Sequence, residues 1–365
     1  MIKKLKTFTL NLIAGANVAA VLLMLLTGYS DHLHPGTHPW LACAGMAFPF
    51  VVLFNLAFVP LWVLFSWRRL LIPVVGLALA YVPIRIYIPL HFGSDAVPEG
   101  ALRIVSYNVA GYAGNWKYEQ AFDTIFNYMQ RVQPDILCIQ EDMTSNWLDT
   151  NKKYSRLFPY NDTVRISSPQ SSMLNCLGMH TRFPIVRKER ISYESRVNGS
   201  VAFFLLIEGD TVIVINNHLE STHLSTKDRD RYQEMLKGMM SRDTARAETS
   251  LIIDKLGYAK ARRARHADII HQYVEAHRNY PIILCGDFND TPISYTHHHL
   301  AEGLTDCFVE SGCGLGLSFN RSGFNFRIDH LMCSDHFTPY QCEIDSKMDA
   351  SDHYPLLCWL KIREK

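Results

Sequence analysis

Two hydrophobic patterns divide the chain: long unbroken apolar runs at its start, and short apolar runs separated by polar segments after them. Residues 8–29, 40–67 and 70–90 are near-continuous apolar runs of about 20 residues, the length of a helix that spans a bilayer. A signal peptide has one short apolar core and a cleavage site, so three runs argue against it. The pattern predicts a membrane domain over residues 1–91 with three transmembrane helices.

Basic residues predict how these helices are oriented. They precede the first run and separate the second run from the third, at Lys3, Lys4, Lys6, Arg68 and Arg69. Because basic loops stay in the cytoplasm, we expect the N-terminus there and the chain after Leu90 on the outer side of an inner or plasma membrane. The third run is the weakest, since it contains Arg85 and three prolines. If that run lay on the membrane surface instead, the orientation would invert.

After a polar linker over residues 92–100, the pattern changes to that of an α/β protein. Apolar runs at 102–107 and 136–139 flank residues 118–133, in which apolar residues recur at helical spacing. Further strand patterns follow at 177–180, 185–193, 200–208, 211–216, 282–285, 328–332, 343–347 and 356–362. Residues 142–175 are polar, and we expect them to be irregular. Residues 292–326 contain Pro292 and several glycines, and we expect them to be rich in loops.

A long charged segment, roughly residues 222–277, has the composition of helices. Between 222 and 265 it holds 11 basic and six acidic residues, so it is locally positive. The soluble part as a whole is nearly neutral, with 30 basic and 32 acidic residues after position 100. A protein that grips a nucleic-acid backbone along its length is typically strongly basic. The overall charge therefore does not favour that class.

The nine cysteines do not define the fold. Four lie inside apolar strand patterns: Cys138, Cys285, Cys333 and Cys358. Free buried thiols are common in protein cores, although an exported domain more often pairs or avoids cysteine. Cys307 with Cys313, or Cys333 with Cys342, are pairings that the sequence leaves open. The sequence has no CxxC pair, which argues against a structural zinc site.

Polar residues follow the apolar strands one after another. They are Asn108, Glu141, His218, Asp287 with Asn289, and Asp352 with His353, while Asp329 lies early in a further strand. Taken alone, Gly286-Asp287-Phe288-Asn289 is also an ordinary turn sequence. A whole series of such strand ends has a common explanation if they meet at one edge of a sheet. Clustered carboxylates then need a cation, and oxygen ligands favour Mg²⁺, Mn²⁺ or Ca²⁺ over zinc.

Six motifs in order resemble those of the endonuclease/exonuclease/phosphatase superfamily. They are 107–109 (Tyr-Asn-Val), 140–141 (Gln-Glu), 216–219 (Asn-Asn-His-Leu), 286–292 (Gly-Asp-Phe-Asn-Asp-Thr-Pro), 327–330 (Arg-Ile-Asp-His) and 351–356 (Ser-Asp-His-Tyr-Pro-Leu). That superfamily includes deoxyribonucleases, apurinic-site endonucleases, neutral sphingomyelinases and inositol polyphosphate 5-phosphatases. The motifs cover residues 101–362, and the membrane part has no counterpart in the named enzymes. The whole chain therefore resembles a membrane-anchored, bacterial-type member of the superfamily.

The resemblance implies a four-layered α/β sandwich over residues 101–365, with two packed central sheets flanked by helices. It also implies hydrolysis of phosphoester bonds with Mg²⁺ or Mn²⁺. By motif, Glu141 is the expected principal metal ligand, and Asn108 and Asp352 complete the metal site.

The same resemblance implies the catalytic residues. Asp287 is expected to align or deprotonate the attacking water, and Asn289 to hold a phosphate oxygen. Asp329 is expected to orient His353, as the carboxylate does in a catalytic triad. His353 would contact the phosphate or transfer a proton, while His218 would stabilise phosphate charge or protonate the leaving group.

Histidines set this chain apart from parts of the superfamily. At the position of His218 the apurinic-site enzymes typically have Tyr, so His is similar to the deoxyribonuclease and sphingomyelinase branches. His330 is interpreted as a core residue because it faces away from Asp329 along its strand. Residues 297–299, three consecutive histidines, are interpreted as a helix start near the edge of the site. A metal role for the histidines between the first two membrane helices is a minor alternative, at His32, His34 and His38.

Three hypotheses for the substrate follow. The first is a phosphodiesterase or phosphatase that acts on lipid headgroups or small phosphorylated molecules beside the bilayer, where the basic segment meets anionic headgroups. The second is an extracytoplasmic nuclease, in which that segment grips backbone phosphates. The third is a non-catalytic anchored binding domain, which the full set of catalytic residue types argues against. The bilayer and a phosphorylated substrate are the expected partners, and no protein partner is predicted.

Overall fold

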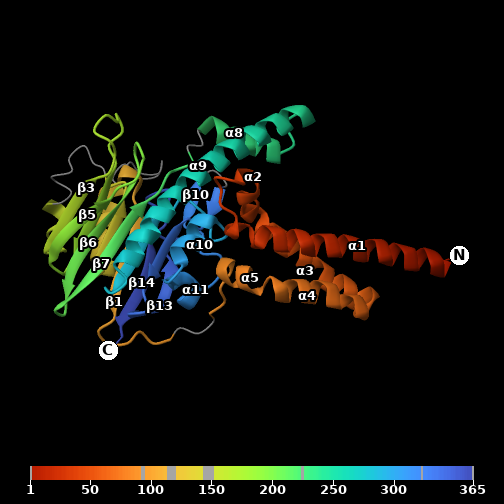
Figure 1. Cartoon of the computed structure of the whole chain (residues 1–365), viewed down its shortest axis with the longest axis horizontal. Coiled ribbons are helices and arrows are strands. Elements are labelled where there is room, and N and C mark those ends of the chain that lie inside the picture. The colour runs from red at the N-terminus through yellow and green to blue at the C-terminus, as the bar shows by residue number, and fades with distance from the viewer. Residues whose placement is uncertain are drawn as a thin grey trace.

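The computed structural model describes residues 2–91, 95–112, 121–142, 152–222, 226–321 and 324–363. Apolar helices project from one end of a layered α/β part (Figure 1). The segments Lys3–His32 and Pro39–Phe65 are each long and apolar enough to cross a membrane, with mean hydropathies of 2.0 and 2.2. They are built on α1 (Ile2–Gly28) and α3 (Phe48–Phe65), with η1 (Ser30–His32), α2 (Pro39–Ala42) and η2 (Ala44–Ala47) between them.

The third expected transmembrane helix is broken rather than continuous. The chain forms η3 (Trp67–Leu70), α4 (Leu71–Leu79) and α5 (Tyr81–Tyr87), and its direction changes by 60° at the break. The cause is Pro83, which has no N–H to donate to the carbonyl of Leu79 four residues earlier. The hydroxyl of Tyr29 donates to that carbonyl instead, at 2.7 Å. This partner from the end of α1 makes the break compatible with an apolar environment.

Two six-stranded mixed sheets form the centre of the soluble part. The strand order of the first sheet is β13-β14-β1-β2-β4-β3, with bounds Phe337–Ile344, Leu356–Ile362, Leu102–Asn108, Ile136–Gln140, Cys176–Thr181 and Tyr160–Arg165. The order of the second is β5-β6-β7-β8-β12-β9, with bounds Ile185–Ile191, Gly199–Ile207, Asp210–His218, Ile282–Asp287, Asp329–Cys333 and Thr305–Asp306. Within the described strands, β1 with β2 and β7 with β8 are the parallel pairs.

The sheets pack face to face on an apolar core that both contribute to, and helices cover their outer faces. Alternate residues of strands in both sheets fill the shared core, including Ile104, Met179 and Phe203. On the outer face of the first sheet lies α6 (Ala121–Val132). The second is covered by α9 (Arg242–Ala276) and α10 (Tyr295–Ala301). The predicted four-layered sandwich is thereby confirmed.

Several local expectations were wrong. A strand, β3, crosses the region 142–175, which was expected to be irregular. The region 292–326 holds β9, α11 (Cys307–Ser311) and the hairpin of β10 (Phe319–Arg321) with β11 (Phe324–Phe326). The strand expected at 343–347 begins earlier and ends at Ile344, as β13. All nine cysteines lie in the described part and are free thiols, so neither of the pairings that the sequence left open is formed. The Cys307 thiol lies 3.7 Å from Cys333 Sγ.

The turn that follows β8 packs directly against the ends of the apolar helices that adjoin the sandwich. Ile293 is fully buried in one cluster with Met24, Phe48 and Tyr87. A Cβ atom at Gly45 would lie 2.2 Å from the carbonyl oxygen of Ile293, so this close approach requires glycine. The sandwich therefore rests on the ends of the apolar helices as well as being linked to them by the chain.

Candidate active site

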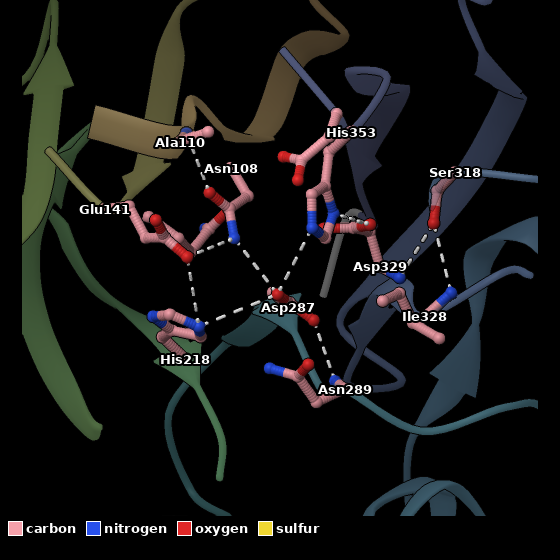
Figure 2. A network of polar contacts seen from close by, with 12 residues as sticks. Asn108, Ala110, Glu141, His218, Asp287, Asn289, Ser318, Ile328, Asp329 and His353 are labelled. Atoms are coloured by element: carbon pink, nitrogen blue, oxygen red, sulfur yellow. Dashed lines mark hydrogen bonds and ion pairs between the residues drawn. The ribbon is translucent and has the colours of Figure 1, made fainter. Parts of the chain in front are cut away.

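The ends of both parallel strand pairs bring the predicted site residues together. Asn108 ends β1, and Glu141 follows β2 directly. In the second sheet His218 is the register partner of Asp287 at the end of the pair β7 and β8. Asp287 also lies opposite Asp329, the first residue of β12. Figure 2 shows these side chains, with those of Asn289 and His353, converging on one point.

The backbone is unusual at three points around this site. Gly286 has φ of 133°, and a Cβ atom there would lie 2.0 Å from the carbonyl oxygen of Asn217. Glu141 and Asn289 have positive φ values of 54° and 53°. Non-glycine residues rarely adopt this left-handed conformation, and when they do they are often found at functional sites. The chain thus turns sharply after β2 and after β8. These turns direct the side chains of Glu141 and Asn289 back over the edge of the sheets.

Asp287 is the centre of the polar contacts. The amide nitrogen of Asn108 donates to Asp287 Oδ2 at 3.0 Å and to Glu141 Oε1 at 3.3 Å. The backbone N–H of Asn289 donates to Asp287 Oδ1 at 2.7 Å. The Nε2 atoms of His218 and His353 each lie 3.7 Å from Asp287 Oδ2. Donors and imidazoles therefore surround this carboxylate on several sides (Figure 2).

The carboxylate of Asp329 fixes the orientation of His353. Asp329 Oδ2 lies 2.8 Å from His353 Nδ1, which leaves Nε2 facing Asp287. The hydroxyl of Ser318 accepts hydrogen bonds from the backbone N–H groups of Ile328 and Asp329, both at 3.0 Å, and so holds the start of β12. This is the carboxylate–imidazole pair that the sequence predicted, with its support on a neighbouring loop.

Burial and neighbouring charges shift the protonation of these groups. Burial alone would lower the pKa of His353, but the carboxylates of Asp329 and Asp287 outweigh it and raise that pKa to about 10. Burial, together with the charge of Asp329, raises the pKa of Asp287 to about 6. Burial lowers the pKa of His218, although Asp287 opposes this. His353 is thus set up as a cation and His218 as a neutral imidazole at neutral pH.

The donor set fits a hard divalent cation. Burial raises the pKa of Glu141, although the charge of His353 and the hydrogen bond from Asn108 lower it, so a further cation beside Glu141 would favour its charged form. Asp329 Oδ1 has no hydrogen-bond partner among the described residues. Carboxylate oxygens of Asp287 and Asp329 lie within 4.8 Å of each other and of a ring nitrogen of His353, but His353 is protonated at neutral pH and would not itself ligate an ion. An acid-rich, largely oxygen-containing cluster of this kind favours Mg²⁺ or Mn²⁺.

Two of the three expected metal ligands have other partners in this structure. The amide oxygen of Asn108 accepts from the backbone N–H of Ala110 at 3.0 Å. Asp352 Oδ2 accepts from Arg321 Nη1 at 3.0 Å. Glu141 Oε1 faces the site, 3.7 Å from His218 Nε2. Of these three residues, Glu141 is therefore the one whose oxygen already points at the centre of the cluster.

Sequence comparison identifies the family. Residues 105–353 match the Endonuclease/Exonuclease/phosphatase family over most of the chain. The chain belongs to this family. Its members are in general phosphoester hydrolases and commonly use divalent metal ions. Residues 10–87 match a separate family described as a domain of unknown function (DUF8431). No curated protein sequence matches the chain.

Solved structures of the Endonuclease/Exonuclease/phosphatase family share the fold of the sandwich. The human Nocturnin catalytic domain, with a bound sulfate anion, aligns with a TM-score of 0.52 and 18% identity over 74% of this chain and 98% of that one. TDP2 of D. rerio, complexed with single strand DNA product, aligns with a TM-score of 0.51 and 14% identity over 72% and 100%. A family protein from Bacteroides thetaiotaomicron gives 0.50 and 17% over 72% and 98%. At these identities the likeness establishes the fold alone.

The structure adds supporting residues that the sequence analysis did not select. Asn175 lies with its amide nitrogen 3.0 Å from His218 Nδ1. Asp290, fully buried, pairs with Lys260 and Arg263 of α9. The three-residue spacing of Lys260 and Arg263, which puts two cations on one buried face of a helix, was a readable signal. No pattern in the sequence pointed to Asn175, because it is one polar residue in a polar loop.

Proposed function

We propose that this protein is a membrane-anchored, divalent-metal-dependent phosphoester hydrolase that acts on phosphorylated headgroups at the bilayer. The division into a membrane domain (1–91), a linker (92–100) and a catalytic domain (101–365) is part of this proposal. The observation that carries it is the position of Ile293. That residue packs among the ends of the membrane helices. It lies six positions after Asp287, a stretch of chain that spans at most roughly 20 Å.

Asp287 is proposed as the residue that activates water. Its Oδ1 is held by the N–H of Asn289 at 2.7 Å, so Oδ2 is the atom left facing the site. With a pKa of about 6, it is ionised at neutral pH and still basic enough to take a proton. One N–H of the Asn289 side chain donates to the carbonyl of Leu219 at 3.0 Å, and we assign the second N–H to a phosphate oxygen.

The two imidazoles are proposed to act on the phosphate and the leaving group. His353, kept protonated by Asp329, carries positive charge toward the site and would stabilise charge that builds up on phosphoryl oxygens. His218 has Nδ1 held by Asn175 and Nε2 free to face the site, so it would hold or pass on the proton that the leaving oxygen needs. A divalent ion held by Glu141, with Asn108 and Asp352 beside it after their side chains turn inward, would supply further charge neutralisation when bound.

The basic helices give a reason to favour a bilayer substrate. A surface recess of about 350 Å³ is lined by Trp40 of α2 and by Arg242, Ala245 and Arg246 at the start of α9. Trp40 is exposed, and tryptophan beside arginine is typical of a membrane interface. In Figure 1, α8 (Thr226–Leu236) and the start of α9 extend past the sandwich toward the membrane helices. This arm would meet anionic headgroups beside the active site.

A substrate panel tests the proposal. The full chain in detergent or nanodiscs, with Mg²⁺ or Mn²⁺, is offered sphingomyelin, glycerophospholipids, inositol phosphates, RNA and plasmid DNA. We expect metal-dependent turnover of a lipid or small phosphorylated substrate that Asp287→Asn and His353→Gln abolish. Asp335→Asn, at an exposed aspartate outside the site, is the matched control and should keep full activity.

A nuclease is the second candidate, because the DNA product complex of TDP2 shows that this fold accommodates nucleic acid. Turnover of DNA or RNA without turnover of any lipid would establish it and refute the headgroup proposal. A non-catalytic binding domain would show no metal-dependent turnover of any substrate in the panel, with Asp287→Asn indistinguishable from wild type in binding.

A further inference from the structure

Two histidine-rich segments that lie far apart in the sequence meet where the membrane helices join the sandwich. The first is the loop after α1, and the second is α10, whose residues 297–299 are consecutive histidines. The imidazoles of His32 and His298 have their centroids 4.3 Å apart. His34 contributes an Nε2 atom 3.6 Å from Asp268 Oδ2 on α9. None of these groups belongs to the active site described above.

The carboxylate of Asp31 contacts the imidazoles of both His32 and His298. Its Oδ1 is 2.8 Å from His32 Nδ1, and its Oδ2 is 3.7 Å from His298 Nδ1. The Asp31 side chain is 5% exposed, whereas those of His32 and His298 are 57% and 34% exposed. The three residues each offer a ligand atom within 4.8 Å of the others. Tetrahedral Zn²⁺ with ligands at about 2.0–2.1 Å brings them to roughly 3.3 Å from one another, so small side-chain rotations suffice.

Space for an ion and its water is present beside this trio. A recess of about 220 Å³ is lined by Asp31 and His298, together with Arg85, Thr305 and Glu310. That volume holds several water molecules, since one water takes about 30 Å³ of liquid. An entering ion would reach the trio from solvent, and a water would complete a four-coordinate shell of three protein ligands, as in open zinc sites.

We propose that Asp31, His32 and His298 form a binding site for a transition-metal ion of the Zn²⁺ class. Two imidazoles and one carboxylate are a zinc-type donor set, in contrast to the oxygen-rich active site, which favours Mg²⁺ or Mn²⁺. The ion would join the end of α1 to α10, so it would fasten the membrane part to the sandwich.

A neighbouring group of similar type serves as the internal comparison. His271, His299 and Glu302 also offer ligand atoms within 4.8 Å of one another. His271 lies on α9, His299 lies on α10, and Glu302 directly follows α10, so an ion bound to them would join no membrane segment. The side chain of Glu302 is about half exposed. The trio with Asp31 is favoured because it has a buried carboxylate, an adjoining recess and ligands from both parts of the chain.

Zinc titration of the full chain tests this proposal. The protein in detergent is stripped with a chelator and returned to excess Mg²⁺, and Zn²⁺ binding is then measured by calorimetry, with Co²⁺ absorption as a spectroscopic readout. We expect wild type to bind Zn²⁺, and His32→Gln and His298→Gln each to weaken that binding at least about tenfold. His38→Gln, in the same loop, and Glu141→Ala, in the active site, should keep it.

Wild type should also melt at a higher temperature with Zn²⁺ than with Mg²⁺ alone, since an ion bound to the folded state stabilises it. His32 is exposed enough that its replacement leaves the packing intact, so loss of binding in that variant reports on ligation. The proposal is overturned if wild type binds no Zn²⁺ in excess Mg²⁺, or if His32→Gln and His298→Gln bind it as wild type does. It is also overturned if His271→Gln removes the ion while His298→Gln retains it.

Discussion

Replacing Asp290 with Asn should destabilise the turn that carries Asn289, one of the proposed catalytic residues. Asp290 is fully buried and follows Asn289 directly. Its carboxylate accepts from Lys260 Nζ, from Arg263 Nε at 3.1 Å and from Thr296 Oγ1 at 3.0 Å. Burial alone would raise the pKa of Asp290, but Lys260 and Arg263 lower it to about 2. Asp290→Asn keeps the shape of the side chain and removes the charge that both cations share.

The expected cost follows from the buried charges that remain. Breaking a buried ion pair by removing one partner costs about 3–5 kcal/mol, because the other charge is left without compensation. Here two buried cations lose one carboxylate, so we expect the upper part of that range, about 5 kcal/mol. For a domain of this size, 1 kcal/mol corresponds to roughly 2–4 °C in melting temperature. The melting temperature of the sandwich should therefore fall by roughly 10 °C or more.

Thermal unfolding of the full chain in detergent, followed by circular dichroism, measures this effect. Asp335→Asn is the control, because its side chain is 90% exposed, and it should melt within about 1 °C of wild type, as surface substitutions generally do. Adding Lys260→Met to Asp290→Asn removes one uncompensated cation and should recover part of the loss. A change below 1 kcal/mol for Asp290→Asn, or a double variant less stable than the single one, would refute the reasoning.

The same pair predicts a pH dependence of stability. The pKa of Asp290 is depressed in the folded state, so its contribution is complete above the unfolded pKa of about 3.9 and is lost as pH falls toward 2. The size of that contribution is about 2.5 kcal/mol. Wild type should lose more stability between pH 5 and about 2 than Asp290→Asn does, and equal losses would contradict the assignment.

Three further variants test other parts of the structure. Asp329→Asn removes the charge that keeps His353 protonated. In steady-state kinetics, kcat should therefore fall at least about 100-fold with little change in KM. An unchanged kcat would remove Asp329 from the mechanism. Gly286→Ala places a Cβ atom 2.0 Å from the carbonyl oxygen of Asn217 at φ of 133°, and it should lower the free energy of unfolding by more than about 1 kcal/mol. Ile293→Ala opens a cavity in the cluster with Met24 and Phe48, and it should cost about 2–5 kcal/mol in chemical denaturation, whereas wild-type stability would mean that this contact is not formed.

Much of the fold was predictable because periodic patterns and strand-end residues carry the information locally. The strand ending at Asp287, the helix before residue 134 and the final strand at 356–362 were all predicted close to their bounds. What the sequence did not reveal depends on partners far along the chain. The strand β3 is polar and mostly half-buried, so it lacks the apolar alternation that marks a strand. The break at Ala80 needed both Pro83 and the hydroxyl of Tyr29 to be seen together.

The sequence predicted which residues form the candidate site, but it did not predict how they are arranged in space. Sequence motifs selected Asn108, Glu141, His218, Asp287 and His353, and the structure brings them together. Their hydrogen-bond partners were not visible, since Asn175 and Ser318 lie in loops whose path is set by tertiary packing. The proximity of residues 30–38 to α10 was equally hidden, because no periodicity relates a loop between the apolar helices to a helix of the sandwich.

Hydrolysis in water labelled with heavy oxygen tests the central claim most directly. The full chain, Mg²⁺ and the substrate that the panel identifies are combined, and the phosphorus-containing product is analysed by mass spectrometry. If Asp287 activates water for attack on phosphorus, the phosphoryl group of the product carries one labelled oxygen, and Asp287→Asn forms no labelled product. Label in the alcohol product instead, or the same labelled yield from Asp287→Asn, would contradict the proposed mechanism.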